Sequence, residues 1–84
     1  MKYLVDLLKI NKIKYTEGFY TNEPSIIIKN NKYKIEIFYD SFSKELVSDL
    51  QRIPYTWGRM GSTSIEGIIN DLNEYLGIEV KINE

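Results

Sequence analysis

The sequence has no cysteine, no histidine and no alanine, and it has only two prolines among its 84 residues. Without cysteine the chain has no disulfide, no thiolate nucleophile and no soft ligand for a metal. Without histidine it lacks the side chain that most often acts as a general base or as a metal ligand near neutral pH. No apolar run approaches the roughly 18 residues of a transmembrane helix. We therefore expect no cofactor, no metal site and no membrane partner.

Motifs of catalysis are missing as well. The sequence has no glycine-rich phosphate loop followed by lysine, and no run of carboxylates with the spacing of a calcium loop. Ser62, Thr63 and Ser64 are three hydroxyl side chains in a row, but a helix start explains them better than a nucleophile does. We therefore expect a protein that is not an enzyme.

Composition indicates one soluble globular domain over residues 1–84. Apolar residues make up 43% of the chain and charged residues 27%, which is too apolar for disorder. Asp6 and Lys9 interrupt the first apolar stretch before it reaches the length of a signal peptide, so we expect a cytoplasmic protein. Isoleucine, lysine, asparagine and tyrosine are abundant, and their codons are AT-rich. The composition therefore favours an AT-rich genome, such as that of a low-GC bacterium, one of its phages or another mobile element.

Charge is distributed unevenly along the chain. Residues 1–34 contain seven lysines and three acids, a net charge of +4, whereas residues 35–84 contain four basic residues and nine acids, a net charge of −5. Such an arrangement can steer a charged partner onto one part of the surface. The simpler interpretation is that these are ordinary solvated side chains.

A helix is best marked over residues 63–76. Thr63 and Glu66 match a capping box at its start, and Gly77 suits a left-handed cap at its end. Its apolar residues recur at three- and four-residue spacing and form one stripe: Ile65, Ile68, Ile69, Leu72, Tyr75 and Leu76.

A β-hairpin is predicted over residues 26–39. Asn30 and Asn31 suit a two-residue turn because asparagine tolerates positive φ. The register that follows places Ile28 opposite Tyr33 and Ile26 opposite Ile35. Alternation then puts five apolar side chains on one face: Ile26, Ile28, Tyr33, Ile35 and Ile37.

Weaker patterns complete the predicted fold. Alternation predicts strands over residues 13–19 and 78–82. Helical spacing predicts a short helix around residues 4–8 and another over residues 42–53, while residues 54–61 are expected to form a loop or an irregular strand. The resulting order is α-β-β-β-(α)-α-β. The simplest fold that buries every apolar stripe is a small α+β domain, in which helices pack on one face of an antiparallel sheet.

Residues 53–61 have the composition of a binding loop. Tyr55, Trp57, Arg59 and Met60 belong to the residue types that dominate binding hot spots, and glycine and proline flank them. We predict these four side chains as a protein-binding site. The alternative is that the only tryptophan anchors the core, which leaves Arg59 and Met60 as the interface residues.

Gly58-Arg59-Met60-Gly61 is a G-x-x-G motif between two predicted helices, and here the sequence resembles the type II KH domain. That family has the order α-β-β-α-GxxG-α-β and clamps a single-stranded nucleic-acid backbone with this loop. The resemblance covers most of the chain in element order and four residues in motif. It implies that Gly58, Arg59 and Gly61 contact phosphates. The sequence departs from the family in an extra strand and in acids on the following helix, such as Glu66, which would repel phosphate.

Lysines offer a second route to nucleic acid. Lys29, Lys32 and Lys34 share the hairpin face opposite the isoleucines, and Lys12 and Lys14 can join them. With aromatic residues nearby, this face would resemble a basic platform with stacking surfaces. The alternative is that these lysines keep the wet face of the sheet soluble and block edge pairing.

Three functions remain open from the sequence. We favour a non-enzymatic protein-binding module, for example an inhibitor that a phage or mobile element encodes against a host defence protein; its partner is then a host or phage protein. The first alternative is a small nucleic-acid-binding domain that uses the KH-like loop or the lysine face. The second is a homo-oligomeric regulatory or structural subunit, joined by the acidic last helix or by the strand predicted at residues 78–82.

Overall fold

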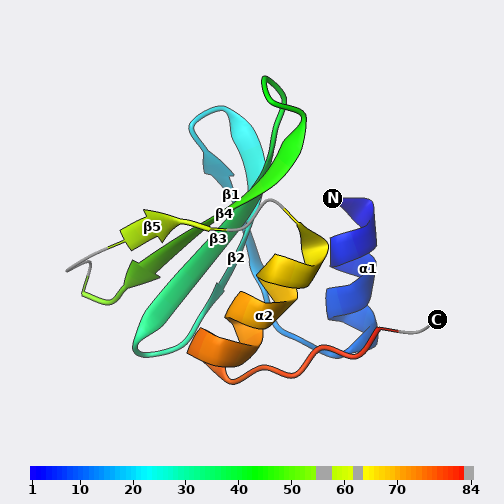
Figure 1. The fold of residues 1–84 in the computed structure, drawn as a ribbon, viewed down its shortest axis with the longest axis vertical. Helices are drawn as coiled ribbons and strands as arrows, with labels where there is room; N and C mark the ends of the chain where they lie inside the picture. The colour runs from blue at the N-terminus through cyan, green and yellow to red at the C-terminus, as the bar shows by residue number, and fades with distance from the viewer. Residues whose placement is uncertain (55–57, 62–63, 83–84) are drawn as a thin grey trace.

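The chain folds into a five-stranded antiparallel sheet with two helices, and the computed structural model describes residues 1–54, 58–61 and 64–82. The elements in chain order are α1 (Lys2–Ile10), β1 (Thr16–Tyr20), β2 (Glu23–Lys29), β3 (Tyr33–Asp40), β4 (Glu45–Arg52), β5 (Gly58–Met60) and α2 (Ile65–Leu76). Each strand pairs with the strands next to it in the chain. Both helices lie on the same side of the sheet (Figure 1). The predicted α+β fold with an antiparallel sheet is confirmed.

Alternation along the strands divides the sheet into a helix-side face and an outer face. The helix-side face carries the core, where buried apolar residues of β2, β3 and β4 meet those of both helices. Each such side chain contributes about 1.5–3 kcal/mol when it leaves water. The buried cluster consists of Leu4, Leu8, Ile26, Ile28, Ile35, Ile37, Leu50, Ile68 and Leu72.

α2 begins and ends close to the predicted positions. Its N-cap is Ser64, whose hydroxyl oxygen accepts a hydrogen bond from the backbone N–H of Gly67 at 3.0 Å. Thr63, the predicted cap, lies outside the described residues. At the other end Gly77 adopts the left-handed conformation with φ of 65°, as predicted.

The β2–β3 hairpin has a register shifted by two residues from the predicted one. Ile28 lies opposite Ile35 and Ile26 opposite Ile37. The turn is centred one residue later because the side-chain oxygen of Asn30 accepts hydrogen bonds from the backbone N–H groups of Lys32 and Tyr33, at 2.8 and 2.7 Å. A shift of two keeps every side chain on its face, so the predicted core face is correct although the pairs are not.

The helix predicted over residues 42–53 is wrong, because this segment contains β4. The carboxylate of Asp40 accepts a hydrogen bond from the Ser43 hydroxyl at 2.9 Å, which closes a turn that reverses the chain directly after β3. Leu46 and Leu50, four residues apart, share a face in a strand as well as in a helix. Their spacing therefore did not distinguish the two structures.

The strand predicted at residues 78–82 is also wrong, because this segment pairs with no strand among the described residues. Ile78 and Val80 still pack against the core, as their alternation requires. The backbone of Lys81 bonds to one side chain instead: Asn11 accepts from its N–H at 2.8 Å and donates to its carbonyl at 3.0 Å.

Candidate functional site

The predicted binding loop is only partly described, and its described residues do not form one patch. Tyr55 and Trp57 lie outside the described residues, and Arg59 and Met60 belong to the edge strand β5. Because they are neighbours in a strand, their side chains point to opposite faces of the sheet. The site predicted at these four residues stays a prediction.

Arg59 reaches from β5 to α2 on the helix side. Its Nη2 lies 3.5 Å from Oδ1 of Asp71 and 3.4 Å from the hydroxyl of Tyr75. The guanidinium also lies 5.6 Å from the centre of the Tyr75 ring. The hydrogen bond to Tyr75, supported by the charge of Asp71, raises the pKa of Arg59 above its usual value. With 45% of its side chain exposed, Arg59 fastens β5 to α2 and still faces solvent.

The G-x-x-G motif does not form a loop between two helices. Gly58 and Arg59 are part of β5, and the element before it is a strand, so the element order behind the KH resemblance is wrong. Gly61 lies against β4, where a Cβ atom would overlap the hydroxyl of Ser48 and lie 3.1 Å from Oδ2 of Asp71. The absence of a side chain at the second glycine of the motif is therefore explained by its close packing against β4.

The predicted lysine face is only partly assembled. Lys29 and Lys34 are direct neighbours across β2 and β3. Lys32 lies in the turn between these strands, and Lys12 and Lys14 lie before β1. The ammonium of Lys34 is 3.6 Å from Oε1 of Glu36, a carboxylate on the same outer face. The positive charge of this face is thus partly compensated.

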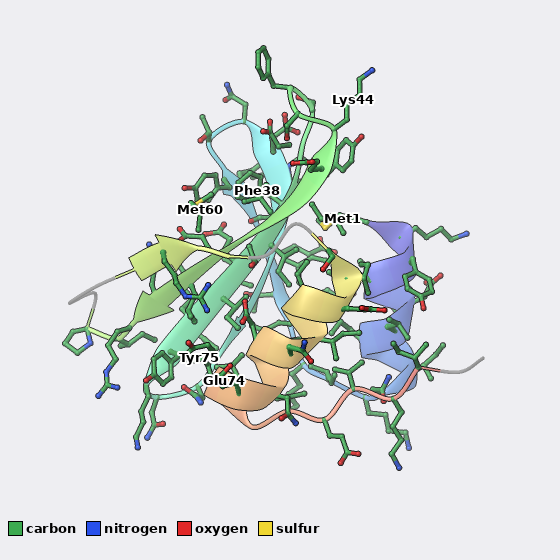
Figure 2. All side chains as sticks on the ribbon, viewed as in Figure 1. Met1, Phe38, Lys44, Met60, Glu74 and Tyr75 are labelled. Carbon is green, nitrogen blue, oxygen red and sulfur yellow. The ribbon has the colours of Figure 1, made fainter. Side chains whose placement is uncertain are left out.

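The outer face is curved so strongly that a side chain of the first strand, β1, reaches a side chain of the last strand, β5. The Tyr20 ring of β1 stacks on Phe38 of β3 with ring centres 4.2 Å apart. The Tyr20 hydroxyl then lies 3.9 Å from the sulfur of Met60 on β5. Figure 2 shows Phe38 and Met60 close together on the part of the sheet away from the helices. The curvature buries Phe38, which is only 6% exposed.

Two carboxylates lie in this curved face, directly opposite each other on β3 and β4. Glu36 and Asp49 are 7% and 8% exposed. Glu36 accepts a hydrogen bond from the Ser25 hydroxyl at 2.6 Å, and Asp49 accepts one from the Gln51 amide at 3.3 Å. Burial raises the pKa of Asp49, the charge of Glu36 raises it further, and the charge of Lys34 opposes both. The sequence does not indicate this pair, because acids and lysines on one face are typical of a solvated strand.

A row of apolar side chains crosses the helix-side face where the helices do not cover it. The upper ends of the β1–β2 and β3–β4 hairpins project beyond both helices (Figure 1). Phe19 lies opposite Pro24, and Tyr39 lies opposite Leu46. Phe19 is 75% exposed and Tyr39 is 42% exposed. We call Phe19, Pro24, Tyr39 and Leu46 the overhang row.

The overhang row continues into a hollow beside α1. Met1, the N-cap of α1, and Val5 within the helix face Phe19, Pro24 and Ile26 across a cavity of about 500 Å³. Figure 2 shows Met1 between the sheet and the start of α1. The end of the sheet therefore offers a partner both an apolar row and a recess.

Phe42 stands at the tip of the β3–β4 turn and is 95% exposed. The Asp40 carboxylate accepts hydrogen bonds from the backbone N–H of Phe42 at 3.1 Å and from the Ser43 hydroxyl at 2.9 Å. The Ser41 hydroxyl donates to Glu23 at 2.5 Å, which ties this turn to the β1–β2 hairpin. The hydrogen bonds from Ser43 and then Phe42 lower the pKa of Asp40. Their contribution to the stability of the turn is therefore present above the ordinary pKa of a carboxylate and is lost as the pH falls through the lowered pKa.

Within the described residues, neither helix has the length and apolar character needed to cross a membrane, and no group of three or more acidic side chains is arranged to hold a metal ion. The comparisons with known proteins give no relative: no family model matches the chain, and neither a curated protein nor a solved structure matches it.

Proposed function

We propose that this chain is a non-enzymatic protein-binding module that contacts its partner through the overhang row and Phe42. The observation that carries the proposal is the row itself: aromatic side chains stand in water on a sheet face that the helices leave open. Aromatic residues are enriched in protein interfaces, and contiguous exposed apolar surface is typical of binding sites. Phe19 and Tyr39 do not belong to the core cluster, whereas Leu46 packs against it.

The surface is held in place before any partner arrives. Phe19 and Tyr39 are fixed by the pairing of β1 and β3 with their neighbours. The backbone of Phe42 is held by the hydrogen bond that Asp40 accepts from its N–H. Little backbone conformational entropy is then lost on binding, which raises the affinity that a given contact area supports. Such a surface suits a folded protein with a matching apolar patch.

An inhibitor that a phage or mobile element encodes is one form that such a module takes. The AT-rich composition is what supports this origin. The target would be a host protein with an exposed apolar surface.

The test is an affinity pull-down from the lysate of a low-GC bacterium, with and without nuclease, followed by mass spectrometry. The Phe19→Ser/Phe42→Ser double variant is compared with Tyr3→Ser, a control on α1 where Tyr3 is 55% exposed. Exposed substitutions change stability by only about 0.5 kcal/mol, so all three proteins stay folded. Loss of hot-spot side chains costs about 2 kcal/mol or more each in binding.

The proposal predicts one captured protein that survives nuclease, is lost with the double variant and is retained with Tyr3→Ser. Capture that nuclease abolishes would instead indicate nucleic acid. Equal capture by the double variant would show that the overhang row is not the contact surface. Self-association by light scattering that the double variant removes would make the partner a second copy.

A further inference from the structure

A second surface opens at the start of β1, at the opposite end of this strand from Phe19, where β1 separates from β2. The pairing of β1 with β2 begins at Thr16 opposite Ile27. Ile28 and Lys29, the last residues of β2, pair with β3 and have no strand on their other side among the described residues. Alternate N–H and C=O groups along such an edge point away from the sheet. Because backbone groups alternate between the two neighbours of a strand, one of these two residues directs its N–H and C=O to the open side.

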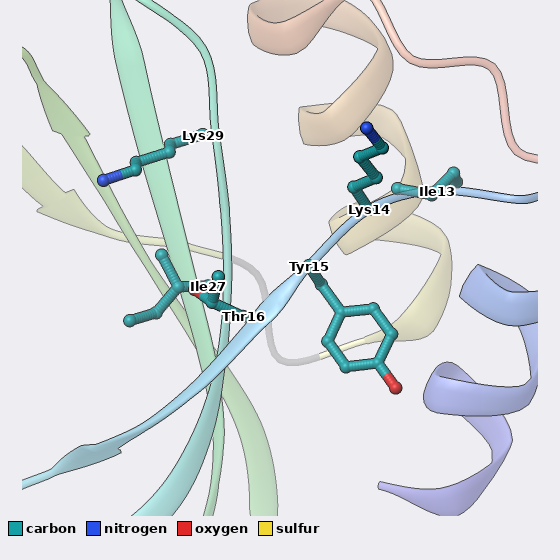
Figure 3. Close-up of a pocket in the computed structure, with 6 residues that line it drawn as sticks. All are labelled: Ile13, Lys14, Tyr15, Thr16, Ile27 and Lys29. Atoms are coloured by element: carbon teal, nitrogen blue, oxygen red, sulfur yellow. The ribbon is translucent and has the colours of Figure 1, made fainter.

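The chain before β1 cannot close this edge because it is held to α1. The N–H of Ile13 donates to the carbonyl of Leu8 at 2.9 Å, and Lys12 takes a left-handed conformation with φ of 57°. Ile13 and Tyr15 then pack against the core. These contacts direct residues 13–15 away from β2, as Figure 3 shows.

The separation leaves a cleft with a volume of 490 Å³. Apolar groups of Ile13, Tyr15 and Ile27 line it, together with Lys14 and Lys29. Figure 3 shows the two lysine side chains pointing to different sides of the cleft, so that they flank it. Both lysines are exposed, and residues 1–34 together carry a net charge of +4.

We propose that this cleft binds an extended segment of a partner protein that carries acidic side chains, added as a strand against the free edge of β2. In this mode of recognition, main-chain hydrogen bonds supply affinity and alternate side chains supply specificity. The two lysines, one at each border of the cleft, match carboxylates of the segment, and the apolar groups of Ile13, Tyr15 and Ile27 match aliphatic side chains. A phosphodiester backbone only accepts hydrogen bonds, so it complements a strand edge less completely than a peptide does. The cleft is separate from the overhang row, and the two proposals can fail independently.

The test begins with display selection of a random peptide library against the wild-type protein. The Lys14→Glu/Lys29→Glu variant serves as the counter-target, and Lys2→Glu/Lys9→Glu on α1 is the charge-matched control. We expect enriched peptides that combine acidic and aliphatic residues. Their Kd should rise about tenfold or more with the cleft variant, because two cation–carboxylate contacts become repulsive, and should stay within about twofold with the control.

Two further readouts identify the mode of binding. Peptide binding should shift the backbone amide signals of residues 13–16 and 27–29 in NMR spectra. N-methylation of alternate peptide amides should weaken binding about fivefold for each hydrogen bond removed.

Four outcomes would overturn the proposal. The first is the absence of enrichment over the counter-target. The second is N-methylated peptides that bind as well as the parent, which rules out strand addition. The third is an oligothymidylate that shifts the same amides and displaces the selected peptide, which would assign the cleft to nucleic acid. Signals that shift only at Phe19, Tyr39 and Phe42 would place peptide binding on the overhang row instead.

Discussion

Substitution of Gly61 by alanine tests whether this glycine serves packing or ligand binding. Its φ lies outside the left-handed region, so the backbone conformation itself accepts alanine. The obstacle is space: the new Cβ would overlap the hydroxyl of Ser48 and lie 3.1 Å from both the Ser48 carbonyl and Oδ2 of Asp71. Ser48 is 0% exposed, and the Gly61 N–H donates to its carbonyl, so β4 has little freedom to move away.

The magnitude follows from two opposing effects. Overpacking of a buried site costs about 1–3 kcal/mol. Replacing glycine by alanine also restricts the unfolded chain, which raises the free energy of unfolding by about 0.4–1 kcal/mol. We therefore expect Gly61→Ala to lower the free energy of unfolding by about 1–2 kcal/mol. In a domain of this size each kcal/mol corresponds to about 4–8 °C in Tm.

The assay is a double-mutant cycle with Ser48→Ala, followed by urea denaturation and thermal melting. The Ser48 hydroxyl has no hydrogen-bond partner among the described residues, so its removal alone should be neutral or stabilising. Removing it also frees the space that the new methyl group needs, and Gly61→Ala should cost about 1 kcal/mol less in this background. A Tm for Gly61→Ala equal to wild type, or a cost that Ser48→Ala does not reduce, would refute the packing argument. Unchanged stability would then favour a role for Gly61 in contacting a ligand.

Three further predictions concern other contacts. Asp49→Asn should raise the free energy of unfolding at neutral pH, because burial raises the pKa of Asp49 and the folded state carries the cost of its charge; the gain over wild type should shrink as pH falls through that raised pKa, and a gain that is constant from neutral to acidic pH in urea titrations would contradict the assignment. Asn11→Ala should increase amide hydrogen exchange at Lys81 and leave the sheet amides unchanged, since this side chain holds both backbone groups of Lys81. Arg59→Glu should cost about 1 kcal/mol by replacing a partly exposed ion pair with repulsion from the buried Asp71; a larger loss of partner binding in the pull-down would support the binding site predicted on β5.

Regular elements with their own end signals could be predicted from the sequence. The apolar stripe of α2 repeats through three turns, and Gly77 stands where a left-handed cap ends it. The hairpin face was predicted correctly because alternation alone sets it. The hairpin register was not, because it depends on the hydrogen bonds of the Asn30 side chain, which move the turn by one residue.

The remaining differences come from contacts between distant parts of the chain. Leu46 and Leu50 suit a helix or a strand equally, and the turn at Asp40, followed by pairing with β3, decides for the strand. Residues 78–82 alternate as a strand does, but the two edges of the sheet are β1 and β5, and Asn11 takes up the backbone of Lys81 instead.

The candidate site could not be predicted for a related reason. Phe19 and Tyr39 have the pattern of core residues, and they are exposed only because the strands extend beyond the helices. No local pattern records how far a helix reaches along a sheet. The signal closest to this site was the Asp40-Ser41-Phe42-Ser43 segment, whose spacing of acid and hydroxyl groups is typical of a hydrogen-bonded turn.

The order of strands in the sheet has a consequence for how the molecule assembles. Since each strand pairs only with its neighbours in the chain, every hairpin can close over a short loop before the next one forms. Such sequential pairing lowers contact order and speeds folding relative to sheets that need distant strands to meet. The contacts between the two helices and the sheet join parts of the chain that are far apart in sequence, so they are expected to form more slowly. A sheet that formed before both helices had packed would expose its isoleucine face, and the chain would be most prone to aggregation at that stage.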